Sequence, residues 1–178
     1  MQKNICQEPG CIRVFDVFPF YNELDLLELR LKILSEVVDY FVISECDETF
    51  SGQKKPMHFA ENRGRYEKFS AKIIYNPVGP KELADMSNEP WVAYRTRADH
   101  VREHKHGGRA PQSLHPSLKR EITHRDAAVR GLLPHVRNKD LILLSDVDEI
   151  PKVSAIERMK GTENIELTYF EMDWFLYY

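Results

Sequence analysis

The first half of the chain alternates between short apolar runs and segments whose apolar residues recur at helical spacing. The runs at 11–20, 38–45 and 71–78 are rich in β-branched and aromatic residues, which favours buried strands. The stretches at 23–37 and 58–70 between them favour helices. This alternation predicts an α/β fold with a parallel sheet and right-handed crossovers.

The segment 23–37 is the clearest predicted helix. Its apolar stripe consists of Leu24, Leu27, Leu31 and Leu34. The charged residues are predicted to lie off this stripe: Glu23, Asp25, Glu28, Arg30 and Lys32. Asn22 precedes the segment and is predicted to be its N-cap, because asparagine accepts a hydrogen bond from the first free backbone amides of a helix.

Residues 79–116 interrupt this rhythm with glycines, prolines and basic side chains, and we predict an irregular excursion with at most one helix, at about 91–104. Its histidine and basic residues include His100, His104, His106, Arg95, Arg97, Arg102, Lys105 and Arg109. An exposed charged loop is the favoured interpretation. A lid over a bound diphosphate comes second, and a zinc site at His100 and His104 is the least favoured.

Regular structure is predicted again after the excursion. The expected elements are a helix at 117–136, a strand at 140–145, a polar turn at 146–151, a helix at 153–160 and a strand at 164–178. A chain of 178 residues fits one domain, which we place at 1–178.

The composition excludes several classes of protein. With 42% hydrophobic and 30% charged residues, the chain is typical of a globular protein. A net charge of -3 gives no overall positive field that would attract nucleic acid. No apolar leader and no run of about 18 apolar residues is present, which predicts a cytoplasmic location without a membrane span. Cys6, Cys11 and Cys46 are interpreted as free thiols in preference to a Cys6–Cys11 disulfide.

Acidic residues follow directly on the strand predicted at 140–145. Asp146, Asp148 and Glu149 would stand at the carboxyl edge of the parallel sheet, where α/β folds bind ligands. Alternate residues of an extended segment point to the same side, so Asp146 and Asp148 can share a divalent cation. A solvated acidic turn is the alternative. We call residues 146–149 the acidic turn.

Three segments in a fixed order carry a more specific signal: VFDVFPFYNELDLLELRLKIL, VDYFVISECDETFSGQKKPMHF and LILLSDVDEIP. Together they resemble glycosyltransferase family 17, the β-1,4-mannosyl-glycoprotein 4-β-N-acetylglucosaminyltransferase family. The resemblance implies a GT-A type nucleotide-diphospho-sugar transferase fold, with a Rossmann-like, mostly parallel central sheet flanked by helices. It also implies UDP-N-acetylglucosamine as donor, a glycan or glycoprotein acceptor, and a Mn²⁺ or Mg²⁺ ion held by aspartates.

The resemblance assigns roles to individual residues. Asp146 and Asp148 match the metal motif of the family. The implied donor-binding residues are Tyr21, Asn22, Glu23, Glu45, Thr49, Phe50, Gly52, Arg125 and Asp146. Most of them follow the first two strands, whose ends hold the nucleoside in folds of this type.

Simpler interpretations stay open for several of these residues. Asn22 would cap a helix without any ligand. Glu23 would only stabilise the helix through the attraction between its negative charge and the positive end of the helix dipole. Glu45 would be a solvated turn residue and Phe50 a core residue. Arg125 would pair with a glutamate one turn earlier on its helix.

The resemblance implies an inverting transfer, in which the cation stabilises the leaving diphosphate and a carboxylate acts as general base. The candidate bases are Asp173, Glu171 and Glu149. Members of the family continue beyond the tract resembling YFEMDWFLYY, so we expect an acceptor-binding portion to be missing. The alternatives are an inactive nucleotide-sugar-binding module of the same fold and, less favoured, a metal-dependent phosphohydrolase or nucleotidyltransferase.

Overall fold

The computed structural model describes residues 11–87, 116–162 and 168. In these residues four strands form one parallel sheet in the order β3-β2-β1-β4. The strands are β1 (Val14–Phe20), β2 (Tyr40–Cys46), β3 (Ile73–Val78) and β4 (Leu141–Leu144). The predicted α/β fold with a parallel sheet is confirmed.

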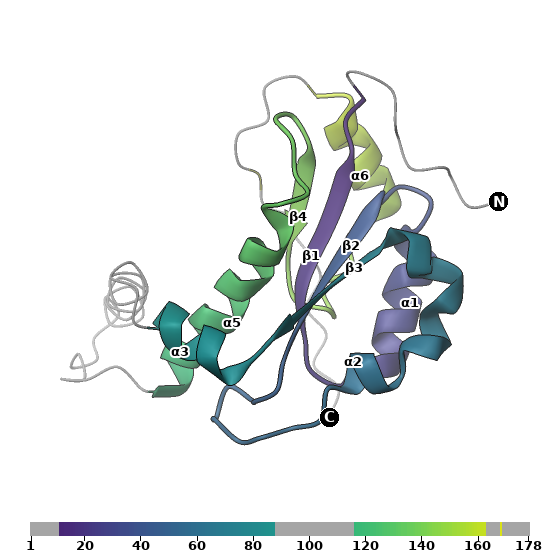
Figure 1. The fold of residues 1–178 in the computed structure, drawn as a ribbon. Coiled ribbons are helices and arrows are strands. Elements are labelled where there is room, and N and C mark those ends of the chain that lie inside the picture. The colour runs from purple at the N-terminus through teal and green to yellow at the C-terminus, as the bar shows by residue number, and fades with distance from the viewer. Residues whose placement is uncertain (1–10, 88–115, 163–167, 169–178) are drawn as a thin grey trace, which may run out of the picture.

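Helices cover both faces of this sheet (Figure 1). One face carries α1 (Leu24–Leu34), α2 (His58–Glu61), the 3-10 helix η1 (Arg63–Lys72) and α6 (Val153–Lys160). The other face carries α3 (Pro80–Ser87) and α5 (Pro116–Leu132).

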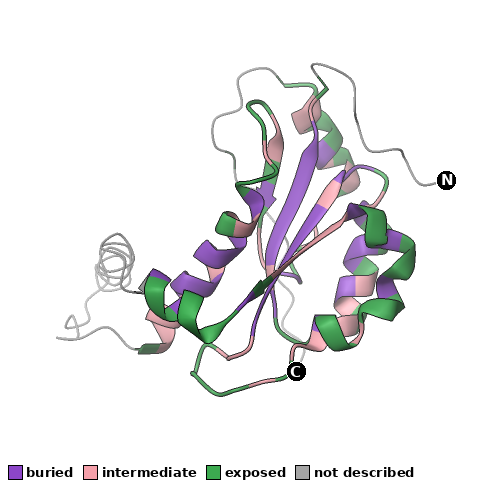
Figure 2. Cartoon of the chain, in the orientation of Figure 1, coloured by how far each residue is buried: buried purple, intermediate pink, exposed green. Residues whose placement is uncertain are grey.

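The central strand β1 is buried on both sides, as Figure 2 shows. Val14 and Phe18 belong to the apolar core beneath α1, while Phe15 and Val17 belong to the core beneath α5. Parallel strands that are covered on both faces read as continuous apolar runs. The run at 11–20 therefore reflects the two-sided burial of β1.

Three helix predictions were wrong in detail. The helix α1 begins at Leu24, its N-cap position is Glu23, and no side chain makes a capping hydrogen bond. The prediction of Asn22 as the N-cap was therefore wrong. The helix α3 lies in the stretch that was predicted to be irregular. The helix expected at 58–70 is divided into α2 and η1 at Asn62.

Several predictions fall outside the described residues. They concern the basic and histidine residues of the excursion, the final strand at 164–178, and the candidate general bases Glu171 and Asp173. No described helix has the length and apolar character that crossing a membrane requires.

The cysteine prediction was half right. Cys46 is a free and buried thiol, but Cys11 is disulfide-bonded. The number and spacing of the cysteines leave the redox state open, so the sequence could not exclude a disulfide.

Candidate functional site

A pocket of about 470 Å³ lies at the carboxyl ends of β1, β2 and β4. The strand β1 and the loop after it contribute Phe20 and Tyr21, and β2 contributes Ser44 and Cys46. The acidic turn after β4 contributes Asp146, Val147 and Asp148. Because the strands are parallel, their carboxyl ends meet at this one edge, as predicted for a ligand site.

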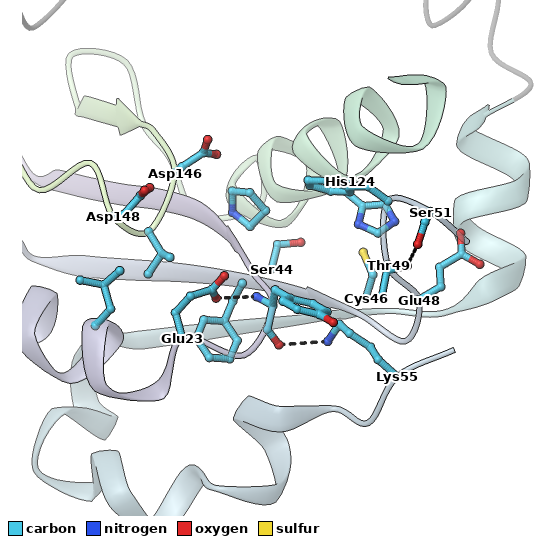
Figure 3. Close-up of a pocket in the computed structure, with 16 residues that line it drawn as sticks. Glu23, Ser44, Cys46, Glu48, Thr49, Ser51, Lys55, His124, Asp146 and Asp148 are labelled. Carbon is cyan, nitrogen blue, oxygen red and sulfur yellow. Dashed lines mark hydrogen bonds between the residues drawn. The ribbon is translucent and has the colours of Figure 1, made fainter. Parts of the chain in front are cut away.

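The pocket has two chemically different ends (Figure 3). Asp146 and Asp148 stand at one end, and the loop after β2 forms the other end with Glu48, Thr49 and Ser51. Glu23 lies between the two ends. The described lining residues include four carboxylates and one ammonium group, that of Lys55. The pocket is therefore acidic.

A buried arginine on α1 supports the acidic turn from below. Arg30 and Asp16 are both fully buried, and the guanidinium donates two hydrogen bonds to the Asp16 carboxylate at 2.7 and 2.8 Å. The guanidinium carbon also lies 4.6 Å from the centre of the Phe18 ring. The prediction that Arg30 lies off the buried stripe was wrong, because position 30 shares the inner face of the helix with Leu27 and Leu34.

The same guanidinium fixes the backbone of the acidic turn. It donates to the carbonyl oxygens of Asp146, Val147 and Glu149 at 2.7, 3.0 and 3.1 Å. It also donates to the hydroxyl of Ser145 at 2.7 Å. Arg30 thereby positions the turn without lining the pocket.

Glu149 closes the acidic turn from within. Its carboxylate accepts a hydrogen bond from the backbone N–H of Asp146 at 2.9 Å, and the residue does not line the pocket. This contact fits a structural role for the side chain. A role as general base stays a prediction.

The carboxylate of Asp146 already has a cationic partner. Arg125 on α5 donates to both of its oxygens, at 2.7 and 2.8 Å. Arg125 also contacts Glu121, one turn earlier, at 3.3 Å. The pairing with a glutamate on the same helix, which the simpler interpretation predicted, is thus present. Arg125 also contacts Asp146 of the acidic turn.

Asp148 is exposed and lines the pocket beside Asp146. In the described part of the chain no three side chains of the kind that bind metals lie together. Mg²⁺ sites often use one or two carboxylates, with substrate phosphates and water completing the shell. The two carboxylates of the acidic turn fit a cation held in that way.

The loop after β1 is held by Glu23 and Lys55. The Glu23 carboxylate accepts hydrogen bonds from the backbone N–H groups of Tyr21 and Asn22 at 3.1 and 3.0 Å. The Lys55 ammonium donates to the carbonyl oxygen of Tyr21 at 3.3 Å, as drawn in Figure 3. Tyr21 and Glu23 line the pocket, whereas Asn22 is exposed and does not.

Glu45 lies below the pocket and does not line it. The residue is fully buried, and its carboxylate accepts hydrogen bonds from the backbone N–H of Phe59 at 3.0 Å and the hydroxyl of Tyr75 at 2.9 Å. Lys55 lies 3.4 Å from the same carboxylate. Glu45 therefore links β2 to α2, β3 and the pocket lysine, and it is not the solvated turn residue of the simpler interpretation.

The loop after β2 turns sharply at Gly52. Its φ of 83° is in the left-handed region, and its N–H donates to the carbonyl oxygen of Thr49 at 2.8 Å. An added Cβ would lie 2.7 Å from the guanidinium carbon of Arg120. Gly52 shapes the loop and does not line the pocket, whereas Thr49 and Phe50 do.

His124 on α5 forms the wall behind this loop. The residue is 5% exposed, and its ring lies edge-on to the ring of Phe50 with the two centres 5.1 Å apart. Among the described residues, its Nε2 has no hydrogen-bond partner. Burial, together with the charges of Lys55 and Arg120, lowers the pKa of His124 to about 4. The imidazole is therefore neutral at neutral pH.

The lowered pKa of His124 predicts a pH-dependent stability. In the unfolded chain His124 takes up a proton near pH 6.5, but in the folded chain only near pH 4. The contribution of the neutral imidazole to the free energy of unfolding is therefore fully present above pH 6.5 and is lost as the pH falls toward 4. The expected loss is about 3 kcal/mol. Urea denaturation of the wild type and His124→Gln across this range measures it, and the variant should have the flatter curve. His135→Gln, at an exposed histidine, is the control; parallel curves for His124→Gln and the wild type would contradict the assignment.

Comparison with known proteins agrees with the resemblance. The sequence profile of the family described as Glycosyltransferase family 17 matches residues 3–105, more than half of the 178 residues. The chain belongs to glycosyltransferase family 17. The matched part of this family 17 protein contains the loops after β1 and β2 and ends before the acidic turn.

Curated relatives extend the similarity further along the chain. The enzymes named beta-1,4-mannosyl-glycoprotein 4-beta-N-acetylglucosaminyltransferase from Rattus norvegicus and Homo sapiens are each 28% identical to this family 17 chain over 150 residues. The Mus musculus enzyme of the same name is 27% identical over 150 residues. These alignments cover 83% of the chain but only 23%, 24% and 23% of the relatives.

No solved structure matches this family 17 chain. The four-stranded parallel sheet with helices on both faces establishes a Rossmann-like α/β fold. The assignment to the GT-A type stays a prediction.

Sequence reasoning missed three residues of the site: Arg30, Lys55 and His124. Arg30 and His124 lie on helix faces shared with buried apolar residues. Their helical spacing from those residues in the sequence could have predicted that both are buried. Lys55 gave no such signal, because it lies in a polar loop whose path the sequence does not specify.

Proposed function

We propose that this family 17 domain binds UDP-N-acetylglucosamine in the pocket and serves the transfer of N-acetylglucosamine to a glycan or glycoprotein acceptor, with inversion at the sugar. The curated relatives carry the name of such an enzyme. The observation that carries the proposal is the pocket itself, in which both aspartates of the acidic turn line the same cavity as the loops after β1 and β2. Those loops and the turn are the segments of the family resemblance.

The charge of the pocket supports a role for a divalent cation. Its described lining has four carboxylates and one ammonium group, so a diphosphate entering alone would be repelled. A Mn²⁺ or Mg²⁺ ion between the acidic turn and the diphosphate would reverse that repulsion. Asp148 is exposed to the pocket and is the first ligand we assign, with Asp146 as the second.

The opposite end of the pocket suits the nucleoside. Phe50 is 38% exposed and lines the pocket, and His124 offers a neutral imidazole whose Nε2 has no partner among the described residues. A buried nitrogen without a partner is costly, and a ligand that supplies the partner recovers that cost. We assign the uracil to this end and the sugar to the end at the acidic turn.

The proposed reaction is a single displacement. The acceptor hydroxyl oxygen forms a bond to the anomeric carbon while the bond from that carbon to UDP breaks, and the hydroxyl proton passes to a general base. A cation at the acidic turn would supply Lewis-acid stabilisation of the leaving diphosphate. In this proposal the described residues hold and orient the donor. The candidate bases Asp173 and Glu171 lie outside the described residues.

Calorimetry tests the binding step. UDP-N-acetylglucosamine should bind in the presence of Mn²⁺ and lose at least about 100-fold in affinity when EDTA removes the ion. GDP-mannose serves as the comparison for the base and should bind more weakly. Affinity that is independent of the metal, or no affinity for any UDP-sugar, would contradict the proposal.

A second assay separates the transferase from the two alternatives. Release of UDP that requires a glycan acceptor identifies a transferase. Binding without turnover identifies the inactive nucleotide-sugar-binding module. Phosphate release from simple phosphate esters without any acceptor identifies a phosphohydrolase.

A further inference from the structure

Arg125 lies between two carboxylates and contacts both. Its guanidinium makes two close contacts with Asp146, at 2.7 and 2.8 Å, and a longer contact with Glu121, at 3.3 Å. The first partner belongs to the acidic turn and lines the pocket, whereas the second lies on the same helix as Arg125. The arginine therefore has a second anionic partner within reach if it leaves the first.

The pairing leaves Asp146 with no unengaged carboxylate oxygen, since each of the two accepts from Arg125. Each oxygen keeps a second lone pair, so a divalent cation that binds this carboxylate competes with Arg125 for its negative charge. Like charges also repel, so a guanidinium and a divalent cation are not expected to share the carboxylate at close range.

We propose that Arg125 is an exchangeable counter-ion of Asp146, which it holds in the free protein and yields to the divalent cation when the donor complex forms. The inference rests on the proposed function. The released guanidinium then keeps its contact with Glu121 and turns toward the diphosphate, a ligand whose paired oxygens match its planar fork.

The energies allow such an exchange. The side chains of Arg125, Asp146 and Glu121 are 35%, 39% and 37% exposed, and ion pairs of this exposure contribute only about 1 kcal/mol or less. The exchange needs no movement of the turn backbone, because Arg30 and Glu149 hold that backbone independently of Arg125. Only side chains have to move.

The exchange makes cation and diphosphate bind together. A cation alone has to break the contacts of Arg125 with Asp146 and leaves the guanidinium only the longer contact with Glu121, so its affinity for the free protein is low. A cation with UDP gives the displaced guanidinium a new partner. Each ligand therefore raises the affinity of the other, as linkage requires.

Titration of Mn²⁺, followed by the electron paramagnetic resonance signal of the free ion, tests the proposal. Without nucleotide, Arg125→Gln should bind Mn²⁺ about fivefold more tightly than the wild type, because no guanidinium competes for its Asp146 carboxylate. With saturating UDP, the wild type should gain Mn²⁺ affinity by a larger factor than the variant. The circular dichroism spectrum of each variant checks that it is folded.

Two further variants separate exchange from a general change in charge. Arg130→Gln removes the same charge from the exposed side of the same helix and should leave Mn²⁺ affinity within about twofold of the wild type. Arg125→Lys keeps the charge without the planar fork and should fall between the wild type and Arg125→Gln.

The outcomes distinguish this inference from the proposed function. If the wild type binds Mn²⁺ and UDP together but Arg125→Gln does not bind Mn²⁺ alone more tightly, the exchange is overturned and the proposed function stands. If neither protein binds Mn²⁺ in the presence of UDP, both are overturned. An equal gain from Arg130→Gln and Arg125→Gln would also overturn the exchange.

Discussion

Replacing Arg30 by methionine is expected to lower the free energy of unfolding by about 3–5 kcal/mol. The change leaves Asp16 as a fully buried carboxylate without its guanidinium partner. It also removes the donor to three carbonyl oxygens of the acidic turn. Urea denaturation followed by circular dichroism measures the loss.

Two comparisons make this prediction specific. Lys32→Met removes a 52% exposed charge from the same helix, and the change should stay within about 1 kcal/mol. The double variant Asp16→Leu, Arg30→Met removes both buried charges but still leaves the turn carbonyls without a donor, so it should recover only part of the stability. A single variant Arg30→Met as stable as Lys32→Met would refute the role of this arginine.

Replacing Asp148 by asparagine is expected to reduce the Mn²⁺-dependent affinity for UDP-N-acetylglucosamine by about 100-fold or more, because it removes the charge of the first assigned cation ligand. The residue is exposed, so the free energy of unfolding should change by no more than about 0.5 kcal/mol. Calorimetry in Mn²⁺ and thermal unfolding measure the two effects separately.

The control for this variant is Glu157→Gln, which makes the same change of charge at an exposed position on α6. It should bind the donor with the affinity of the wild type. If Asp148→Asn keeps the affinity of the wild type, the cation does not bind where we propose.

The sheet could be predicted from the sequence because a strand that is buried on both faces appears as a continuous run of apolar residues. The strand β1 is apolar at nearly every position, which alternating one-sided strands are not. The helix α3 escaped prediction because Gly79 and Pro80 open a long stretch whose general composition favours loops.

The site was predictable where residues are neighbours in sequence and not where distant segments meet. The acidic turn after β4 was found because Asp146 and Asp148 follow an apolar strand directly. Its support by Arg30 was missed because a charged helix residue is normally exposed. Besides the position of Arg30 on the buried helix face, Asp16 inside an apolar strand was a second available signal, since a buried carboxylate needs a partner.

Partner choice was the least predictable property. Arg125 was expected either to pair with Glu121 or to serve the donor site, and it contacts both Glu121 and Asp146. Glu45 was assigned to the nucleoside or to solvent, but its carboxylate meets the backbone of α2. Both outcomes depend on packing between elements far apart in the chain.

The contacts of Arg30 have a consequence for the integrity of the fold. Its guanidinium binds Asp16 of β1 and also carbonyl groups that lie 116 to 119 residues after Arg30 in the chain. The strand β4 pairs with the central strand β1. A fragment ending before Leu141 would leave one edge of β1 without its partner strand, and the buried Arg30 guanidinium would lose four of its six acceptor atoms. We therefore expect that the stretch matched to the family, residues 3–105, does not fold alone, because the segment that carries the two aspartates completes its sheet and its buried hydrogen bonds.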